Sequence, residues 1–210
     1  IEIHQVYGLT ETCGPACLIS PDDALDRAGS TGKEFFFTRV RVVNEAGDDC
    51  GPDEPGEVLV KGPHIMVGYL NREDATAESI VDGWLRTGDV AVMDADGFVY
   101  IQDRVKDMII SGGENVYPAE IENAIFGMEG VNEVAVIGIP SEKWGESPLA
   151  VVVRADDSVT EDSVLDHVSG KLARFKQPKK VEFVDMIPRN PTGKVLKRVL
   201  RDQFADVSAE

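Results

Sequence analysis

The sequence has few basic residues for its length. Its 210 residues include 21 lysines and arginines against 38 aspartates and glutamates, which gives a formal net charge of −17 at pH 7. Proteins that bind nucleic acid need a cationic face, because phosphate contacts supply much of their affinity. The acidic balance therefore argues against general nucleic-acid binding. It does not exclude a small anionic ligand, since a local site can be positive or can use a metal ion.

Cysteine is scarce as well. The three cysteines, Cys13, Cys17 and Cys50, are an odd number that fits a reducing compartment better than a disulfide framework. Cys13 and Cys17 lie four residues apart with no histidine near them, which disfavours a metal site at this position. Histidine is equally rare. The three histidines, His4, His64 and His167, are scattered and do not indicate a catalytic triad with a serine.

The sequence also lacks any apolar run long enough to cross a bilayer, and it has no basic leader with an apolar core. We therefore expect a cytoplasmic location, with peripheral attachment to a membrane left open. A hydrophobic content of 42% predicts a folded globular chain, and the length allows one large or two small domains. The chain begins at Ile1 inside an apolar pattern, so we expect it to be part of something longer.

The first half of the chain carries mostly β patterns. The expected elements are strands at residues 1–6, 37–43 and 57–61 and a short helix at residues 72–80. Residues 90–93 and 98–101 flank the sequence Asp94-Ala-Asp-Gly97, which is typical of a hairpin turn in which Gly97 adopts a left-handed conformation. This half does not have the pattern of a complete domain.

The second half predicts a compact α+β domain. Pro118 opens a helix with acids in its first turn, and Thr160 can cap another helix. The other expected elements are buried strands at residues 134–139 and 149–153, a strand at 181–184 and a final helix on which Leu196, Leu200 and Phe204 face one way. The sequence as a whole predicts an α+β fold, with a β-rich, incomplete first domain over residues 1–104 and a compact α+β domain over residues 105–210.

A charged stretch at residues 103–107 separates the two halves, and Ser111, Gly112 and Gly113 follow it closely. Two adjacent glycines allow the backbone to bend sharply or to lie against a ligand. A charged joint beside such a loop suggests two bodies that move relative to each other, with Lys106 changing partners as they turn. A solvated run of surface charge is the alternative that stays open.

The segment from Tyr7 to Glu11 follows the first expected strand and carries three side chains suited to a nucleotide. Tyr7 can stack on a flat ring, and the Thr10 hydroxyl can donate to a phosphate oxygen. The Glu11 carboxylate can hold Mg²⁺, which prefers oxygen ligands and often bridges to phosphate. A strand end followed by a polar turn would give the same pattern, so this segment alone leaves both interpretations open.

Asp89 ends the segment Trp84-Leu-Arg-Thr-Gly-Asp, just before a strand. A lone carboxylate suits a vicinal diol such as ribose, because each of its two oxygens can accept one hydroxyl proton. Arg104 could donate its planar guanidinium to ribose oxygens or to phosphate. An Asx turn is the alternative for Asp89, and Trp84 is interpreted as a packing residue.

The loop from Pro188 to Lys194 has two prolines that stiffen it and a glycine that frees the backbone beside the lysine. We expect Lys194 at the start of the final helix, where the helix dipole disfavours a cation. A residue that breaks a local rule is a pointer to function, and such a lysine could stabilise negative charge that builds on a phosphate. Lys197 and Arg198 follow closely, so an ordinary surface lysine remains the alternative.

In this order and spacing, the motifs resemble the acyl-adenylate-forming enzymes, which include acyl-CoA synthetases, luciferases and the adenylation domains of peptide synthetases. The likeness extends over almost the whole chain, including residues 56–71. It implies that adenine, phosphate and Mg²⁺ are bound by Tyr7, Gly8, Thr10 and Glu11, with Glu11 as the metal ligand. It also implies ribose contacts for Asp89 and Arg104, a hinge at Lys106 and a catalytic adenylation lysine at Lys194.

Within that family, the segment from Ser111 to Glu122 is similar to acyl-CoA synthetases of the bacterial long-chain type. The resemblance implies that Ser111, Gly112 and Gly113 line the pantetheine path once the small domain has turned. It also implies that the small domain meets coenzyme A near residues 144–146, Trp144-Gly-Glu, and near Phe175 and Lys176. The family's phosphate-gripping loop and most of its acyl pocket are absent here. The chain therefore resembles the last piece of a large domain, residues 1–104, plus a small mobile domain, residues 105–210.

The resemblance implies a parent enzyme that makes acyl-AMP from ATP and a fatty or other carboxylic acid, and then acyl-CoA and AMP. Its small-molecule partners would be ATP, Mg²⁺, the acid and coenzyme A. We expect the isolated chain to be inactive and to expose apolar surface over residues 1–102, which favours self-association or partial disorder. Other classes stay open: an adenylation domain that loads a carrier protein, a luciferase-type oxygenase, a non-catalytic relative, or a domain unrelated to ATP.

Overall fold

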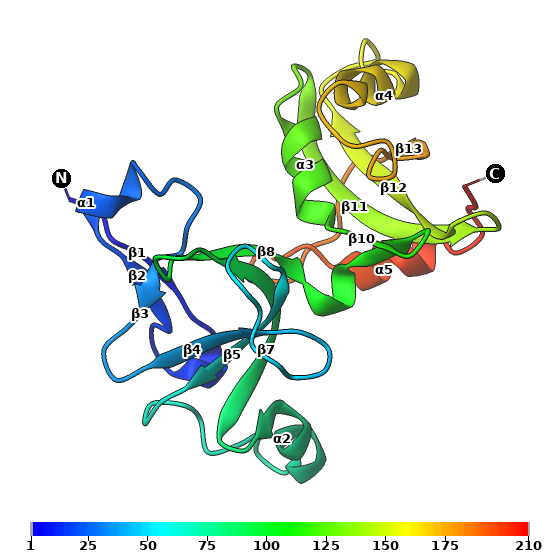
Figure 1. Cartoon of the computed structure of the whole chain (residues 1–210). Helices are drawn as coiled ribbons and strands as arrows, with labels where there is room; N and C mark the ends of the chain where they lie inside the picture. The colour runs from blue at the N-terminus through cyan, green and yellow to red at the C-terminus, as the bar shows by residue number, and fades with distance from the viewer. Residues whose placement is uncertain (1, 210) are drawn as a thin grey trace. The chain divides into compact units, whose positions relative to one another are not determined.

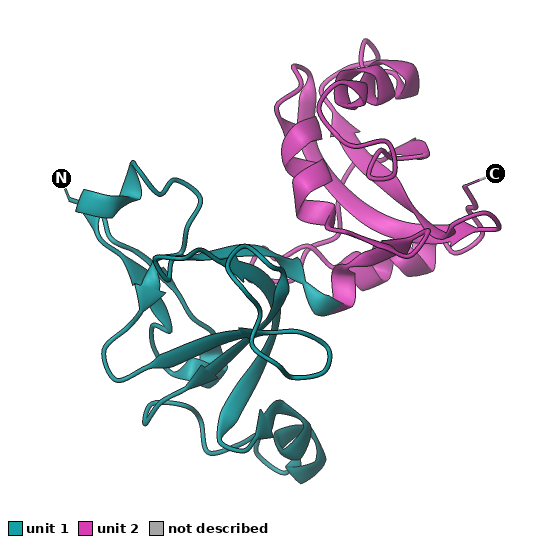
Figure 2. Ribbon diagram, viewed as in Figure 1, with its two compact units in different colours: residues 1–105 teal, residues 106–210 magenta. Residues whose placement is uncertain are grey.

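The computed structural model describes residues 2–209 and divides into two compact units, Ile1–Val105 and Lys106–Glu210 (Figures 1 and 2). The 3₁₀ turn η2 (Val105–Asp107) lies at the division, inside the charged stretch. Both units mix helices with strands, which confirms the predicted combination of elements. No helix between residues 2 and 209 is long and apolar enough to span a membrane.

Unit 1, residues 1–105, is built mainly from antiparallel strands. A small sheet has the order β1 (Gln5–Tyr7), β2 (Cys17–Ile19), β3 (Lys33–Glu34). A five-stranded sheet has the order β4 (Arg39–Val43), β5 (Gly56–Lys61), β7 (Trp84–Met93), β6 (Ile80–Val81), with β8 (Val99–Arg104) paired to β7. The remaining elements are the 3₁₀ turn η1 (Thr10–Thr12) and the helices α1 (Pro21–Ala24) and α2 (Glu73–Ser79).

The core of unit 1 follows from the alternation of apolar side chains. Val40 and Val42 of β4 and Val58 and Val60 of β5 are buried in one cluster, because every second residue of a strand points to the same face. The expected strand at residues 37–43 begins at Arg39 instead, since Phe37 has a left-handed φ of 60°. Of the expected strand at residues 1–6, Ile1 lies outside the described residues and the extended pairing starts at Gln5.

The predicted hairpin at Asp94 to Gly97 is confirmed and joins β7 to β8. The Asp94 carboxylate accepts hydrogen bonds from the amides of Asp96 (3.0 Å) and Phe98 (2.9 Å), and Gly97 has a φ of 85°. Both strands are longer than the predicted strands at residues 90–93 and 98–101. Their pairing places Asp89 opposite Arg104. The hairpin therefore sets the register of two candidate site residues.

Unit 2, residues 106–210, is a mixed sheet with helices on both faces. The strand order is β10 (Glu114–Val116), β9 (Ile109–Ser111), β12 (Gly145–Arg154), β11 (Val131–Ser141), with β13 (Lys180–Phe183) parallel to β12. The helices are α3 (Pro118–Phe126), α4 (Glu161–Ser169) and α5 (Lys197–Gln203). Figure 1 shows α3 beside the long strand β11, and α5 also contacts this strand.

The long strands of unit 2 are buried on both faces, as their continuous apolar runs predict. Ala150 and Val152 of β12 face a cluster with the apolar stripes of α3 and α4, whereas Leu149 and Val151 face a second cluster that includes Leu200 of α5. Because β12 supplies alternate residues to both clusters, it forms the centre of this unit.

Two helices of unit 2 start where the sequence predicts, and a third starts later than predicted. Pro118 opens α3, and Thr160 caps α4 through a reciprocal pair of hydrogen bonds with Ser163. The expectation that Lys194 begins the final helix is wrong, because α5 starts at Lys197. The dipole argument for Lys194 therefore does not apply, and the residue belongs to the preceding loop.

Candidate functional site

The three residues Tyr7, Asp89 and Arg104 meet in unit 1. The Tyr7 hydroxyl donates a hydrogen bond of 2.7 Å to Asp89 Oδ2, and Arg104 Nε lies 3.1 Å from Asp89 Oδ1. Asp89 is 6% exposed, so its two oxygens are presented to these donors rather than to bulk water. Burial, and then the Asp89 charge, raise the pKa of Tyr7 well above its usual range, which keeps the hydroxyl protonated as a donor.

Local backbone geometry holds Asp89 in place. The Thr87 hydroxyl donates to the carbonyl oxygen of Val58 (2.8 Å) and accepts from the Asp89 amide (3.1 Å). Gly88 between them has a φ of 70°, and the pairing of β5 with β7 shifts register nearby. This irregularity turns the strand so that the carboxylate meets Tyr7, which comes from β1.

The loop from Gly8 to Glu11 is fixed by close packing of its backbone. A side chain at Gly8 would bring its Cβ to 2.5 Å from the carbonyl oxygen of Gly14, so this position requires glycine. The buried Thr12 hydroxyl shares its one proton between the carbonyl oxygens of Gly14 (2.6 Å) and Leu9 (2.8 Å), and it accepts from the Leu9 amide at 2.9 Å. Thr10 is exposed on the resulting 3₁₀ turn η1, where its hydroxyl can reach a ligand.

Glu11 sits on the same turn, and its side chain contacts Tyr69. The Tyr69 hydroxyl donates a hydrogen bond of 2.8 Å to Glu11 Oε1. This hydrogen bond, and then burial, raise the pKa of Tyr69 above its usual value. The sequence motifs did not single out Tyr69, although it lies in the family-like segment at residues 56–71.

The residues around Glu11 are compatible with one particular mode of magnesium binding. Within residues 2–209 no group of three or more histidine, cysteine, aspartate or glutamate side chains could hold a metal. Mg²⁺ commonly uses one or two carboxylates together with substrate phosphates and water, rather than a cage made wholly of protein ligands. A single carboxylate beside the exposed Thr10 hydroxyl is compatible with that mode of binding.

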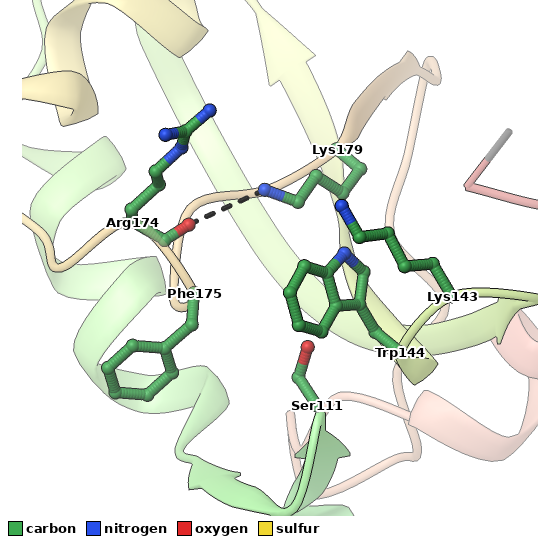
Figure 3. A pocket seen from close by; sticks show the side chains of 6 residues that line it. All are labelled: Ser111, Lys143, Trp144, Arg174, Phe175 and Lys179. Atoms are coloured by element: carbon green, nitrogen blue, oxygen red, sulfur yellow. Dashed lines mark hydrogen bonds between the residues drawn. The ribbon is translucent and has the colours of Figure 1, made fainter.

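Unit 2 contains a separate cavity of about 560 Å³ that is lined by Ser111, Lys143, Trp144, Arg174, Phe175 and Lys179. Figure 3 shows the ammonium groups of Lys143 and Lys179 on the same side of the Trp144 indole. The lining residues include three cations and no carboxylate. Burial, followed by the charges of Arg174 and Lys143, lowers the pKa of Lys179. Like charges gathered beside aromatic rings give a site for a polyanion that carries a flat group.

The sequence identified only part of this cavity. Of the residues for which the resemblance implies a contact with coenzyme A, Ser111, Trp144 and Phe175 line this cavity, whereas Lys176 pairs with Glu120 at 2.6 Å. Lys143, Arg174 and Lys179 were missed. The signal for the last two was a cluster of basic residues at positions 171–180 of an otherwise acidic chain.

The glycine pair is attached to the loop that carries Trp144. Gly112 and Gly113 form the turn between β9 and β10, with φ values of 63° and 88°. The Gly112 amide donates to the Trp144 carbonyl oxygen (2.8 Å), and a Cβ on Gly112 would lie 2.7 Å from indole Cε3. Glu146 Oε2 also accepts from the Ile110 amide at 3.1 Å. The turn and the indole are therefore parts of one packed structure.

The structure places the two candidate lysines of unit 2 on exposed backbone. Lys194 is exposed in a loop that the Asn190 side chain organises by accepting from the Lys194 amide (2.9 Å). Within residues 2–209 no acidic side chain lies within ion-pairing distance of its ammonium group. Lys106 is exposed on η2, whereas its neighbour Asp107 is paired with Arg201 at 2.8 Å. Lys194 does not line the cavity described above.

Comparison with known proteins gives two family matches. Residues 1–70 match the model described as AMP-binding enzyme, and residues 120–194 match the AMP-binding enzyme C-terminal domain. A long-chain-fatty-acid–CoA ligase, FadD13 of Mycobacterium tuberculosis, is 52% identical over 98% of this chain and 41% of the relative. A feruloyl-CoA synthase of Amycolatopsis sp is 46% identical over 95% of this chain and 41% of the relative. The chain thus spans about 41% of the length of these curated relatives.

Solved structures give the same result. The o-succinylbenzoate CoA synthetase MenE from Bacillus subtilis, in complex with the acyl-adenylate intermediate, matches with a TM-score of 0.91 and 40% identity over 96% of this chain and 41% of that one. ATP-bound MatB from Rhodopseudomonas palustris matches with a TM-score of 0.88 and 41% identity over 97% of this chain and 41% of that one. The family resemblance of the motifs is confirmed: this chain belongs to the adenylate-forming acyl-CoA synthetase family.

Proposed function

We propose that the protein carrying this chain is an AMP-forming acid–thiol ligase. It would convert a carboxylate and ATP into acyl-AMP and pyrophosphate, and then acyl-AMP and coenzyme A into acyl-CoA and AMP. The observation that carries this proposal is the buried Asp89 carboxylate held between the Tyr7 hydroxyl and the Arg104 guanidinium. Tyr7 is 82 positions from Asp89, and the pairing of β7 with β8 places Arg104 opposite Asp89, so the fold brings the three residues together.

Asp89 is suited to the ribose of the nucleotide. The two oxygens of a carboxylate offer about four acceptor sites, so Asp89 can keep Tyr7 and Arg104 as donors and still accept from two hydroxyls. Arg104 is partly exposed and can also donate to ribose oxygens. The Tyr7 ring would lie against the base, while its hydroxyl orients the carboxylate.

Lys194 is the residue we propose for the first half-reaction. An oxygen of the acid attacks the α-phosphorus, and the bond to the bridging oxygen breaks as pyrophosphate leaves with the electron pair. The exposed ammonium of Lys194, which has no acidic partner among residues 2–209, would neutralise the negative charge that develops on the carboxylate and the α-phosphate. Glu11 would hold Mg²⁺ beside Thr10, and the metal ion when bound would withdraw charge from the phosphate oxygens.

The second half-reaction needs a thiol in place of that lysine. The thiol sulfur attacks the acyl carbon, loses its proton and releases AMP with the electron pair of the mixed anhydride bond. We propose that unit 2 turns at Lys106 between the two steps, because two half-reactions that share one pocket need different groups. The turn at Ser111, Gly112 and Gly113 would then line the pantetheine arm.

The cavity beside Trp144 supports free coenzyme A as the thiol substrate. Coenzyme A carries several phosphate charges and an adenine ring, and the cavity has three cations and two aromatic side chains. A carrier protein presents the same pantetheine arm without the adenine nucleotide. The charge and the rings of the cavity would therefore be superfluous for a carrier-protein substrate.

A fatty acid is the acid that we propose. FadD13 is named as a long-chain-fatty-acid–CoA ligase and is 52% identical to this chain, whereas the feruloyl-CoA synthase is 46% identical. The test uses the complete gene product with ATP, Mg²⁺ and a panel of fatty, aromatic and dicarboxylic acids. Pyrophosphate exchange reports the first half-reaction, and mass spectrometry reports the acyl-CoA product.

The outcomes of this test are distinct. Acid-dependent pyrophosphate exchange followed by acyl-CoA would support the ligase, and the acid with the highest kcat/KM identifies the substrate. Exchange without acyl-CoA, but with acylation of a carrier protein, would contradict the role of coenzyme A. The 210-residue chain alone, which spans about 41% of the length of its curated relatives, is expected to give no turnover, and thioester formation by it would contradict this expectation.

We also propose that the isolated chain self-associates. Unit 1 exposes large apolar side chains, including Leu25 (90%), Phe36 (78%), Phe37 (88%) and Leu70 (89%). Apolar surface of this kind favours association in water. Sedimentation at increasing protein concentration is expected to show mass above that of a monomer, and a constant monomer mass would contradict the proposal.

A further inference from the structure

Tyr69 makes the one side-chain hydrogen bond that Glu11 receives within residues 2–209. Its hydroxyl donates to Oε1 at 2.8 Å, which leaves Oε2 as the oxygen available to a ligand. The two residues are 58 positions apart, so the contact is set by the fold and not by a local turn. A neutral donor on one carboxylate oxygen is compatible with a cation on the other, whereas a lysine or arginine there would repel it.

The loop that carries Tyr69 is itself anchored to the Glu11 turn and to α2. The Met66 amide donates to the backbone oxygen of Glu11 at 2.9 Å, so the two segments are joined through both backbone and side chain. The Tyr69 amide donates to Thr76 Oγ1 (2.9 Å), and that hydroxyl donates to the Arg72 carbonyl oxygen (2.8 Å). These contacts restrict where the phenol can lie.

The packing of Tyr69 alone does not account for this arrangement. Tyr69 is 37% exposed as a residue, and its neighbours Val67 and Leu70 are 102% and 89% exposed, so the loop contributes little to the core of unit 1. Tyr69 is absent from the buried clusters of the described residues and from the apolar side chains packed against them. The anchoring of an exposed loop onto a carboxylate favours a role in orienting that carboxylate.

We propose that Tyr69 is a positioning residue that holds Glu11 Oε1 and thereby presents Oε2 to Mg²⁺; this inference rests on the proposed function. A carboxylate with a hydrogen bond on one oxygen loses side-chain freedom before the metal binds, so less entropy is lost on binding. Partners of this kind typically change metal affinity by about 10–100-fold. Tyr69 would act only through Glu11 and would not touch the reacting atoms.

The test compares Tyr69→Phe, Glu11→Gln and the double variant in the complete gene product. The direct readout is the dissociation constant of protein-bound Mn²⁺ by electron paramagnetic resonance, with ATP present and no acid. Tyr69→Phe is expected to weaken Mn²⁺ binding by about tenfold, and to raise the Mg²⁺ concentration needed for half-maximal pyrophosphate formation by a similar factor.

ATP binding in the presence of a chelator should not change in Tyr69→Phe. In the Glu11→Gln background, Tyr69→Phe should add no further loss, since its effect passes through that carboxylate.

Tyr100→Phe is the matched control, because it removes a phenolic oxygen from β8 of the same unit, and within residues 2–209 the hydrogen bond to the Glu11 carboxylate comes from Tyr69 and not from Tyr100. Unchanged Mn²⁺ binding in Tyr69→Phe, with weaker binding in Glu11→Gln, would overturn the inference and leave the proposed function intact. A full additional loss in the double variant would also overturn it, since the tyrosine would then act elsewhere. If neither variant changed metal binding, the role of Glu11 in the proposed function would fail as well.

Discussion

The amide of Gly112 donates a hydrogen bond of 2.8 Å to the carbonyl oxygen of Trp144. This contact joins the two-glycine turn of β9 and β10 to the loop that carries the indole, so the pantetheine path and the cationic cavity that we propose are parts of one structure. The position of one should therefore depend on the integrity of the other.

Gly112→Ala is expected to disturb the cavity more than Gly113→Ala does. Both positions have a left-handed φ, which costs about 1–2 kcal/mol for a residue with a Cβ. Only at position 112 would the new Cβ meet the indole, at 2.7 Å, whereas position 113 is open. Thermal unfolding should show a loss in both variants, and only Gly112→Ala should also shift the Trp144 fluorescence and raise the KM for coenzyme A. Equal effects on the KM would show that the ring contact is unimportant.

Lys179→Met is expected to weaken the use of coenzyme A but not of pantetheine. The loss of one charge-assisted contact to phosphate costs about 1.5–3 kcal/mol, which corresponds to roughly a tenfold or greater rise in KM. Pantetheine has no nucleotide phosphates, so its KM should stay the same. Lys180→Met is the control, because this adjacent lysine does not line the cavity. Equal losses with both thiols would place Lys179 elsewhere in the mechanism.

Lys194→Ala is expected to separate the two half-reactions. Adenylation should fall by about 10²–10³-fold, because a positioned donor to developing charge is removed, while thioester formation from supplied acyl-AMP should remain near its original rate. Arg198→Ala is a suitable control, since Arg198 is an exposed cation on the neighbouring helix α5. A loss of both half-reactions to the same extent would contradict the proposed role of Lys194.

Cys17 is expected to be inert in the folded protein. Burial raises the pKa of its thiol from 9.0 to about 12, so the reactive thiolate is suppressed, whereas Cys13 is exposed. A disulfide reagent at about pH 8 should modify Cys13 quickly and Cys17 only after unfolding. Fast modification of Cys17 in the native protein would contradict its burial.

The raised pKa of Cys17 also predicts the direction in which the free energy of unfolding changes with pH. Between pH 9 and about 12 the unfolded chain loses the Cys17 proton while the folded chain retains it, so the unfolded state binds fewer protons and the free energy of unfolding falls as pH rises. The contribution is fully present below pH 9. Cys17→Ala should reduce this fall in a series of denaturant titrations. An unchanged pH dependence in Cys17→Ala would assign the fall to other groups.

Several features were determined by the sequence because their causes are local. Asp94 and Gly97 form the predicted turn since the carboxylate caps neighbouring amides and the glycine adopts a left-handed φ. Thr160 caps α4, and the continuous apolar runs become strands β11 and β12. The family also followed from the sequence, since the motifs that carry it are short and contiguous.

The start of the last helix shows where local rules fail. The Asn190 side chain accepts hydrogen bonds from the amides of Thr192 and Lys194, and the residue pair Arg189 and Val195 forms a bridge. The Asn190 turn and this bridge hold the backbone of residues 189–195 out of the helix, so α5 begins only at Lys197. A dipole argument from sequence could not anticipate a loop that satisfies its own backbone.

Contacts between distant residues were decided by the tertiary structure alone. Strand pairing brings Arg104 opposite Asp89, the anchored loop brings Tyr69 to Glu11, and the packing of unit 2 gathers Lys143, Arg174 and Lys179 around Trp144. The sequence determined which chemical groups this protein has and which short elements carry them, because propensity, capping and turn formation act over a few residues. The fold decided which of those groups meet, since burial and strand register act over the whole of each unit.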